Sequence, residues 1–148
     1  MKTYKYILAF FALAISLSAS LHAQNNSKKD EIEAMKSAFI TRRLNLTPDE
    51  AKTFWPVYNQ CQNDLEVLRK RHRTELANAR MNFDQLSDKE LEKIVDGEVI
   101  FRQGELDVMK KYLPQFKQVL SIRKVAMLYK AEEEFKRELL KRIREKQE

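Results

Sequence analysis

The chain has 148 residues, 34% of them charged, with a formal net charge of +6 and a single cysteine. One cysteine excludes an internal disulfide, and the mixed charge argues against nucleic acid as the natural partner although the sequence pI is about 9.4. This length is enough for one domain with a modest core.

The amino terminus has the pattern of a cleaved secretory signal. Lys2 and Lys5 give it a basic start, an apolar run follows over positions 6–21, and Ala23 is the small residue before a polar stretch. An uncleaved membrane anchor is the alternative, but a spanning helix needs about 20 apolar residues. We therefore predict a signal peptide over residues 1–23 and a mature chain that is soluble outside the cytoplasm.

The mature chain is expected to begin with a short polar segment. Residues 24–30 are polar and are predicted to be a disordered leader, followed by a single domain over residues 31–148. A first helix is predicted from about Lys29 to Arg43, because Ile32, Met35 and Phe39 recur at helical spacing.

Three later segments have the pattern of a helix N-terminus. In each, a leucine precedes a hydroxyl residue, and a charged residue follows three positions after the hydroxyl; the segments are Leu46-Thr47-Pro48-Asp49-Glu50, Leu86-Ser87-Asp88-Lys89-Glu90 and Leu120-Ser121-Ile122-Arg123-Lys124. A Ser or Thr followed by Glu at this distance forms a reciprocal capping box. Lys124 cannot accept a hydrogen bond, so the third cap is expected to keep only its forward half.

The longest predicted helix runs from Pro48 to about Phe83. Apolar residues recur every three or four positions along it, which predicts a seam that packs on another helix; they are Ala51, Phe54, Tyr58, Cys61, Leu65, Leu68, His72, Leu76, Ala79 and Phe83. Cys61 lies on this seam and is either a buried thiol or a cross-linking one. Pro56 removes a helical hydrogen bond, so a kink is expected there.

Two further helices complete the predicted fold. One begins at Asp88 and either ends or bends at Pro114, and the other covers Ser121 to about Glu145. Gly97 and Gly104 lie on nearly the same face of the former and permit close packing or bending. No segment alternates with a period of two. We therefore predict an all-α fold of four helices, one of them long and kinked, arranged as an antiparallel, hairpin-like structure.

Enzymatic and metal chemistry find little support in these residues. His72 is the only histidine after residue 23, and it lies eleven positions from Cys61 on one helix. A rise of about 1.5 Å per residue separates the two by roughly 16 Å, so they cannot share an ion within that helix. We expect no enzyme activity, no cofactor and no metal.

A basic strip is the candidate binding feature. Arg69, Arg73 and Arg80 fall on one side of the long helix together with Gln62, and Trp55 extends the strip toward the helix start. Cations beside apolar side chains can hold a partly unfolded polypeptide. The alternative is that these arginines are solvated and lay their stems over the edge of the core.

The motifs at Leu46–Glu50 and Leu120–Lys124 resemble those of the Spy/CpxP family of periplasmic proteins, known for an LTXXQ motif. The final glutamine is replaced in both. The run Phe54-Trp55-Pro56 is similar to a branch labelled sensors of extracytoplasmic-function sigma factors. This resemblance implies a curved four-helix cradle in the periplasm that forms homodimers and binds unfolded clients without ATP.

Three functional hypotheses follow from the sequence. The first is a chaperone-like protein that binds partly unfolded polypeptides during envelope stress. The second is a sensor module that binds a membrane-bound stress regulator. The third is an exported structural coiled coil without a client, and replacing Arg69, Arg73 and Arg80 by glutamate would separate it from the first.

Overall fold

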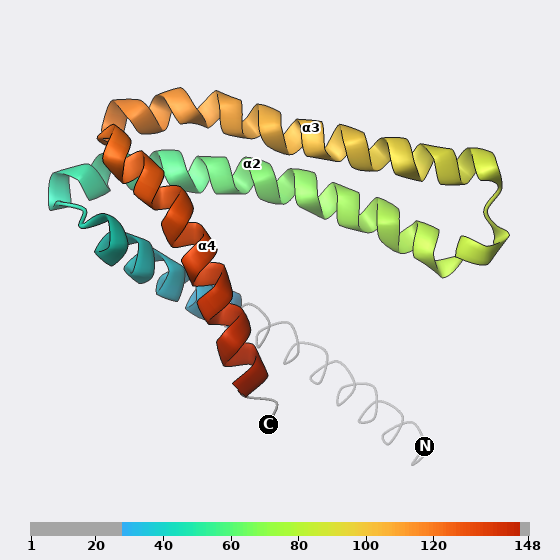
Figure 1. Ribbon diagram of the computed structural model, residues 1–148, viewed down its shortest axis with the longest axis horizontal. Helices are drawn as coiled ribbons and strands as arrows, with labels where there is room; N and C mark the ends of the chain where they lie inside the picture. The colour runs from blue at the N-terminus through green and yellow to red at the C-terminus, as the bar shows by residue number, and fades with distance from the viewer. Residues whose placement is uncertain (1–27, 146–148) are drawn as a thin grey trace, which may run out of the picture. The chain divides into compact units, whose positions relative to one another are not determined.

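The computed structural model describes residues 28–145, apart from the side chain of Asn78, so the predicted signal peptide over residues 1–23 lies outside the described range. Its helices are a segment over residues 28–44, α2 (Pro48–Met81), α3 (Asp88–Val119) and α4 (Ile122–Glu145), with a short 3₁₀ helix η1 (Phe83–Gln85) between α2 and α3 (Figure 1). No strand occurs among the described residues. The prediction of an all-α protein with four helices is confirmed.

Two predicted boundaries differ from the structure. Residues 28–30, which we assigned to a disordered leader, belong to the first helix. Helix α3 does not end at Pro114 but continues to Val119, and the alternative of a bend at Pro114 stays a prediction. Tyr112 and Phe116, on either side of Pro114, are buried, and burial of two aromatic side chains outweighs the one hydrogen bond that proline removes. Helix α2 likewise runs through Pro56, where the expected kink stays a prediction.

The contacts divide the chain into two compact units, and the single domain over residues 31–148 stays a prediction. The first unit joins the residues up to Leu44 to those from Lys130 onward, so it contains the 28–44 helix and most of α4. In it Phe39 and Phe135 pack with ring centroids 5.7 Å apart, and Arg43 pairs with Glu134 at 3.0 Å. The buried residues of this unit are Ile40, Leu44, Ala131 and Phe135.

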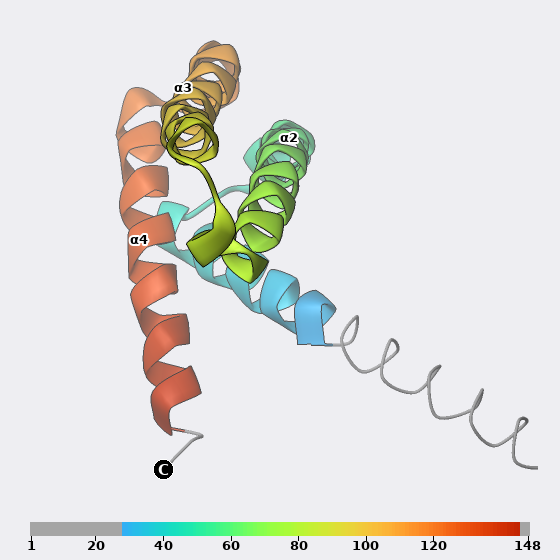
Figure 2. The ribbon, with the colours of Figure 1, turned by 90° about the vertical axis from the view of Figure 1, so that its right-hand side faces the viewer.

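The second unit, Asn45–Tyr129, is built on a hairpin of α2 and α3. The two helices run antiparallel and lie side by side (Figure 1), and Figure 2 looks along them from the end that carries η1. We call residues 48–65 and 111–120, at the end of the hairpin where α2 begins and α3 ends, the base. Residues 66–110, which include η1, are the arm.

The base has a dense aromatic core. Phe54 contacts Phe116 across the hairpin with centroids 6.0 Å apart and Tyr58 on its own helix at 5.3 Å. Cys61 is 5% exposed, so the interpretation of this cysteine as a buried thiol is confirmed. The buried residues of the base are Phe54, Tyr58, Cys61, Leu65, Tyr112, Phe116 and Leu120.

The arm has no such core. Between Leu65 and Tyr112 no residue described in the structure is buried, although the predicted apolar seam continues through Leu68, His72 and Leu76. Those seam residues are only half-buried, and Phe83, its predicted last member, is 57% exposed and lies beyond the end of α2. A pair of helices without a third layer cannot close off its own interface.

The helix caps form as the motifs predict. Thr47 Oγ1 accepts from the Glu50 N–H at 3.2 Å, and Glu50 Oε2 accepts from the Thr47 N–H at 2.9 Å. At α3 the Glu90 carboxylate accepts from the Ser87 N–H at 2.8 Å. Ser121 Oγ accepts from the Lys124 N–H at 3.4 Å, which is the forward half alone, as expected.

Candidate protein-binding site

The first and third capping motifs meet in the base of the hairpin. Lys124 Nζ donates to Glu50 Oε2 at 2.6 Å and to the carbonyl of Asn45 at 2.9 Å. Asn45 has a φ of 46°, the left-handed conformation that asparagine tolerates after the end of a helix. The two positions where the LTXXQ motif has glutamine therefore carry a complementary pair of charges.

This contact also lowers the pKa of the Glu50 carboxyl group. The Lys124 ammonium, followed by the Thr47 N–H, lowers the pKa of Glu50 below its ordinary value of 4.5. The sequence predicted that the Glu50 carboxylate closes a capping box. It did not predict that the same carboxylate also pairs with Lys124, because 74 residues separate the two.

Trp55 lies at the edge of the aromatic core and is half-buried. Its ring packs edge-on against Phe54 and Tyr58, with ring centroids 4.9 Å and 5.3 Å apart respectively. The indole therefore covers one side of the core and presents its remaining edge to solvent. Leu46 and Leu86 are also half-buried, whereas Leu120 is buried.

The predicted basic strip is partly neutralised by acidic neighbours. Arg69 Nε donates to Glu105 Oε1 of α3 at 2.9 Å. Arg73 pairs with Glu66 on its own helix at 2.8 Å, and both side chains are largely exposed. Gln62 is half-buried and Arg80 is exposed. Arg80, near the tip of the arm, is thus the arginine of the strip for which the described residues show no ion pair.

His72 forms a polar layer between the two helices of the arm that the sequence did not predict. Its ring stacks on Phe101 of α3 with centroids 4.0 Å apart and an interplanar angle of 4°. Its Nε2 lies 2.9 Å from Glu98 Oε2, and Arg102 donates to the other oxygen of the same carboxylate. The side chain is 12% exposed, so His72 is a packed imidazole that ties α2 to α3.

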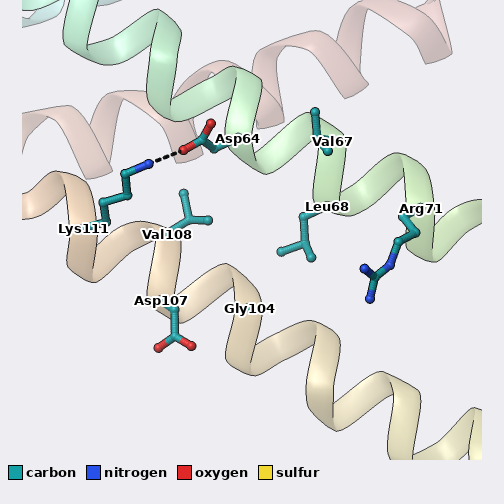
Figure 3. Close-up of a pocket in the computed structure, with 8 residues that line it drawn as sticks. All are labelled: Asp64, Val67, Leu68, Arg71, Gly104, Asp107, Val108 and Lys111. Carbon is teal, nitrogen blue, oxygen red and sulfur yellow. Dashed lines mark hydrogen bonds and ion pairs between the residues drawn. The ribbon is translucent and has the colours of Figure 1, made fainter.

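A shallow groove of about 480 Å³ crosses one face of the hairpin (Figure 3). At one end Asp64 accepts from Lys111 Nζ at 2.9 Å and from the Tyr112 hydroxyl at 2.8 Å. These two donors, Lys111 first, lower the pKa of Asp64. The groove is lined by Asp64, Val67, Leu68, Arg71, Gly104, Asp107, Val108 and Lys111. Val67 is 72% exposed, and Asp107 is turned away from α2.

Gly104 sets the spacing of the helices at this groove. A Cβ atom at Gly104 would lie 3.1 Å from Leu68 Cδ2, whereas a Cβ atom at Gly97 would meet nothing within 4 Å. The two glycines share a face but not a role. Close packing, one of the two roles considered for both, applies to Gly104 alone.

The side of α3 away from α2 carries a row of exposed apolar residues, which we call the outer row. At 100° per residue its members fall within about 80° of one another, and Gly104 lies on the opposite side. The outer row is Val95, Val99, Leu106 and Met109, with exposed fractions of 66%, 67%, 45% and 42%. Arg102 lies within the row, and its guanidinium is bonded to Glu98 and Glu105.

The outer row could have been found in the sequence. Two apolar stripes share α3, one facing α2 and one facing solvent, so the apolar residues do not follow a single helical face. Periodicity shows that Val95 and Leu106 belong to a helical face. It does not show which stripe α2 covers, and this only the hairpin packing decides.

Within residues 28–145, no three or more His, Cys, Asp or Glu side chains gather in a way that could hold a metal ion. None of the described helices has the length and continuous apolar character needed to span a bilayer.

No family model, no curated protein and no solved structure matches the chain.

Proposed function

We propose that this chain is an exported, chaperone-like protein that binds partly unfolded polypeptides on the arm of its hairpin, without ATP and without catalytic chemistry. One observation carries the proposal: the arm has no buried residue in the described range, yet it exposes the outer row along α3. An exposed apolar row of this kind is usually a binding surface, since exposing it otherwise favours aggregation.

Chemistry at the outer row suits a loosely structured client. Val, Leu and Met side chains make nondirectional contacts, and Met109 adapts to varied shapes because its side chain is unbranched. Exposed charges flank the row, so a bound segment keeps its own polar groups solvated. The resemblance to the Spy/CpxP family and the predicted signal peptide support a periplasmic location.

Charge attraction has a smaller part in this proposal than the basic strip suggested. Arg69 and Arg73 already face carboxylates, so their long-range attraction for an acidic client is reduced. Arg80 keeps its charge available near the tip of the arm. Salt is therefore expected to weaken client capture moderately and not to abolish it.

The test is light scattering of guanidinium-denatured malate dehydrogenase diluted into buffer with the mature chain. The chain from Gln24 onward should suppress aggregation at stoichiometric amounts. Val99→Ser should weaken suppression severalfold, because Val99 is 67% exposed on the outer row. The matched control is Ile100→Ser, since Ile100 is the adjacent residue and 65% exposed but lies on another face.

Circular dichroism should show the same helix content for both variants, which excludes unfolding as the cause. If the unmodified chain does not slow aggregation, the chaperone proposal fails. If Val99→Ser and Ile100→Ser lose suppression equally, the outer row is not the binding surface. Arg80→Glu should reduce the salt-sensitive part of suppression and leave the rest.

A second candidate function is a sensor that binds a membrane-bound stress regulator upstream of an extracytoplasmic-function sigma factor. The regular spacing of the outer row favours it, because intervals of four, seven and three residues keep one helical face and match another helix better than an unfolded chain. Affinity purification of the tagged chain from detergent-solubilised membranes, with Val99→Ser as the negative control, tests this. The sensor function is contradicted if the tagged chain recovers no membrane regulator, or if Val99→Ser recovers the same regulator equally well.

A further inference from the structure

We propose that the first unit binds a free, straight-chain fatty acid in a pocket between the 28–44 helix and α4. Arg42 binds the carboxylate, and the hydrocarbon chain lies on the aromatic and aliphatic side chains beside it. All residues of this pocket belong to the first unit, so the site is separate from the arm of the hairpin. It does not depend on the function proposed above.

The pocket has a volume of about 390 Å³. Pockets for small ligands typically measure roughly 300–1,000 Å³. Its lining residues recur at the same spacing on both helices, at positions 35, 38, 39 and 42 on one and at 135, 138, 139 and 142 on the other. Positions i, i+3, i+4 and i+7 share one face of a helix, so each helix turns a single face to the pocket.

The inner side of the pocket is apolar. Phe39 and Phe135 pack with ring centroids 5.7 Å apart, and Phe135 is only 8% exposed. Met35 and Leu139 are half-buried beside them, and Ala38 is exposed. A surface of this composition suits a hydrocarbon chain better than a polar one, because contact with it removes apolar area from water.

Three arginines and one glutamate also line the pocket, and two of the arginines are already paired. Arg43 donates to Glu134 at 3.0 Å. Arg142 donates to Glu138 through Nε at 3.2 Å and through Nη2 at 3.1 Å. Its Nη1 also lies 3.7 Å from Met35 Sδ, a contact that reaches from α4 to the other helix. The charge of Glu138 is therefore compensated within the pocket.

Arg42 is the arginine of this pocket for which the described residues show no carboxylate partner. Its guanidinium lies 5.8 Å from the centroid of the Phe39 ring, and that of Arg43 lies 5.2 Å from the same centroid. Two like charges thus share one ring, and only Arg43 is neutralised. An anion bound to Arg42 would relieve this repulsion. The planar guanidinium can donate two parallel hydrogen bonds to a carboxylate.

These features select the class of ligand. One unpaired guanidinium matches a single negative charge, and Glu138 disfavours a head group with a second one. The adjoining apolar surface rewards an unbranched chain, because affinity rises severalfold with each methylene group that is buried. A fatty acid combines both properties.

Isothermal titration calorimetry of the mature chain with sodium decanoate, below its critical micelle concentration, tests the site. We expect one decanoate per chain, bound about tenfold more tightly than octanoate, since two methylene groups are added. Decyltrimethylammonium carries the same chain with the opposite charge and should not bind. Absence of decanoate binding, or equal binding of the cation, would overturn the fatty-acid site.

Removal of the arginine charge tests how the carboxylate is bound. Arg42→Gln should weaken decanoate binding about tenfold, because a charge-assisted hydrogen bond is lost. The matched control is Arg137→Gln, which removes the same charge from the opposite face of α4 and should leave binding unchanged. Equal weakening in both variants would mean general attraction to a basic protein and would contradict a site at Arg42.

Filling the pocket tests where the chain lies. Ala38→Phe keeps every charge and should abolish decanoate binding, because the ring occupies the space between the helices. Ser37→Phe adds the same ring on the opposite face of the same helix and should have no effect. Circular dichroism should show equal helix content in the two variants. Undiminished binding by Ala38→Phe would place the decanoate outside this pocket.

Two further measurements separate this site from other binding surfaces. Val99→Ser should bind decanoate like the unmodified chain, and a loss there would assign the ligand to the outer row and overturn the pocket. Binding to phosphatidylglycerol vesicles that requires Arg42, without binding of free decanoate, would show that this face docks on a lipid surface instead. A chain that binds decanoate in the pocket but does not suppress aggregation leaves this site standing and overturns the proposed function.

Discussion

The base and the arm of the hairpin are made from the same two helices, yet only the base has a core. In the base, Phe54 and Phe116 pack across the hairpin, and buried residues occur on both helices. In the arm, the corresponding layers contain Leu68 against Gly104 and His72 against Phe101, all half-buried. The difference teaches that an apolar seam is not sufficient for a core, because closing one requires side chains large enough, or a further layer, to exclude water.

The two regions also differ in what their polar groups do. In the base, Asp64, Lys111 and Tyr112 form a hydrogen-bonded cluster at the edge of a buried aromatic layer. In the arm, His72 and Glu98 replace part of the apolar interface itself. Polar contacts therefore supplement hydrophobic burial in the base and substitute for it in the arm, where we expect the lowest local stability.

Truncation of phenylalanines should show the largest contrast. Phe54→Ala in the base should lower the free energy of unfolding by about 3–5 kcal/mol, because it leaves a cavity in a closed core. Phe101→Ala in the arm should cost roughly 1–2 kcal/mol, since that ring is half-buried and loses one stacking partner. Urea denaturation followed by circular dichroism measures both.

Exposed Phe83 provides the control for this series. Phe83→Ala should change the unfolding free energy by less than about 0.5 kcal/mol. Equal losses for Phe54→Ala and Phe101→Ala would mean that the arm is as well packed as the base, and the comparison would fail.

The two glycines of α3 should respond differently to alanine. Gly97→Ala should stabilise the protein by about 0.5–1 kcal/mol, because alanine favours the helix and its methyl group meets nothing within 4 Å. Gly104→Ala should gain less or lose stability, since its methyl group would lie 3.1 Å from Leu68. Thermal unfolding of the two variants decides this, and equal gains would contradict the close approach at Gly104.

Acid should weaken the base. Lys124 and the Thr47 N–H lower the pKa of Glu50, and Lys111 and Tyr112 lower the pKa of Asp64. Groups with lowered pKa values stabilise the folded state above their unfolded pKa values, near 4, and this contribution is lost as the pH falls through the folded values. The melting temperature should therefore fall as the pH is lowered below about 5.

A double variant isolates the contact between the capping motifs. Glu50→Gln with Lys124→Gln places glutamine at both motif positions, removes the titrating pair and keeps a group that can cap α2. Its melting temperature should depend less steeply on pH than that of the unmodified chain. An unchanged slope would show that the Glu50–Lys124 contact does not contribute to acid sensitivity.

The smallest effects should come from the basic strip. Arg73→Ala should change the unfolding free energy by less than about 0.5 kcal/mol, since Arg73 and Glu66 are exposed and lie on one helix. Arg69→Ala should cost somewhat more, about 1 kcal/mol, because it removes a cross-helix bond to the mostly buried Glu105. The reverse order in urea denaturation would show that Arg73 has a structural role which its exposure does not indicate.

Local signals in the sequence predicted much of the fold. The capping boxes at Thr47 and Ser87 were predictable because each depends on residues three positions apart. The buried half of the α2 seam, through Leu65, was predictable because helical periodicity places apolar residues on one face. Whether α3 ends at Pro114 or continues through it was left open, since the outcome depends on the burial of Tyr112 and Phe116 against distant residues.

Sequence by itself determined the helices, their caps and the two apolar stripes of α3, because these follow from spacing along one helix. Only the tertiary structure decided which stripe meets α2 and which is left as the outer row, since a helical wheel does not identify the neighbour of each face. It also decided that Glu50 meets Lys124 and that His72 stacks on Phe101. The first contact depends on where α4 begins, and the second depends on the antiparallel pairing of α2 with α3. The candidate binding surface is therefore a property of the packing: it is the apolar face that the hairpin leaves uncovered.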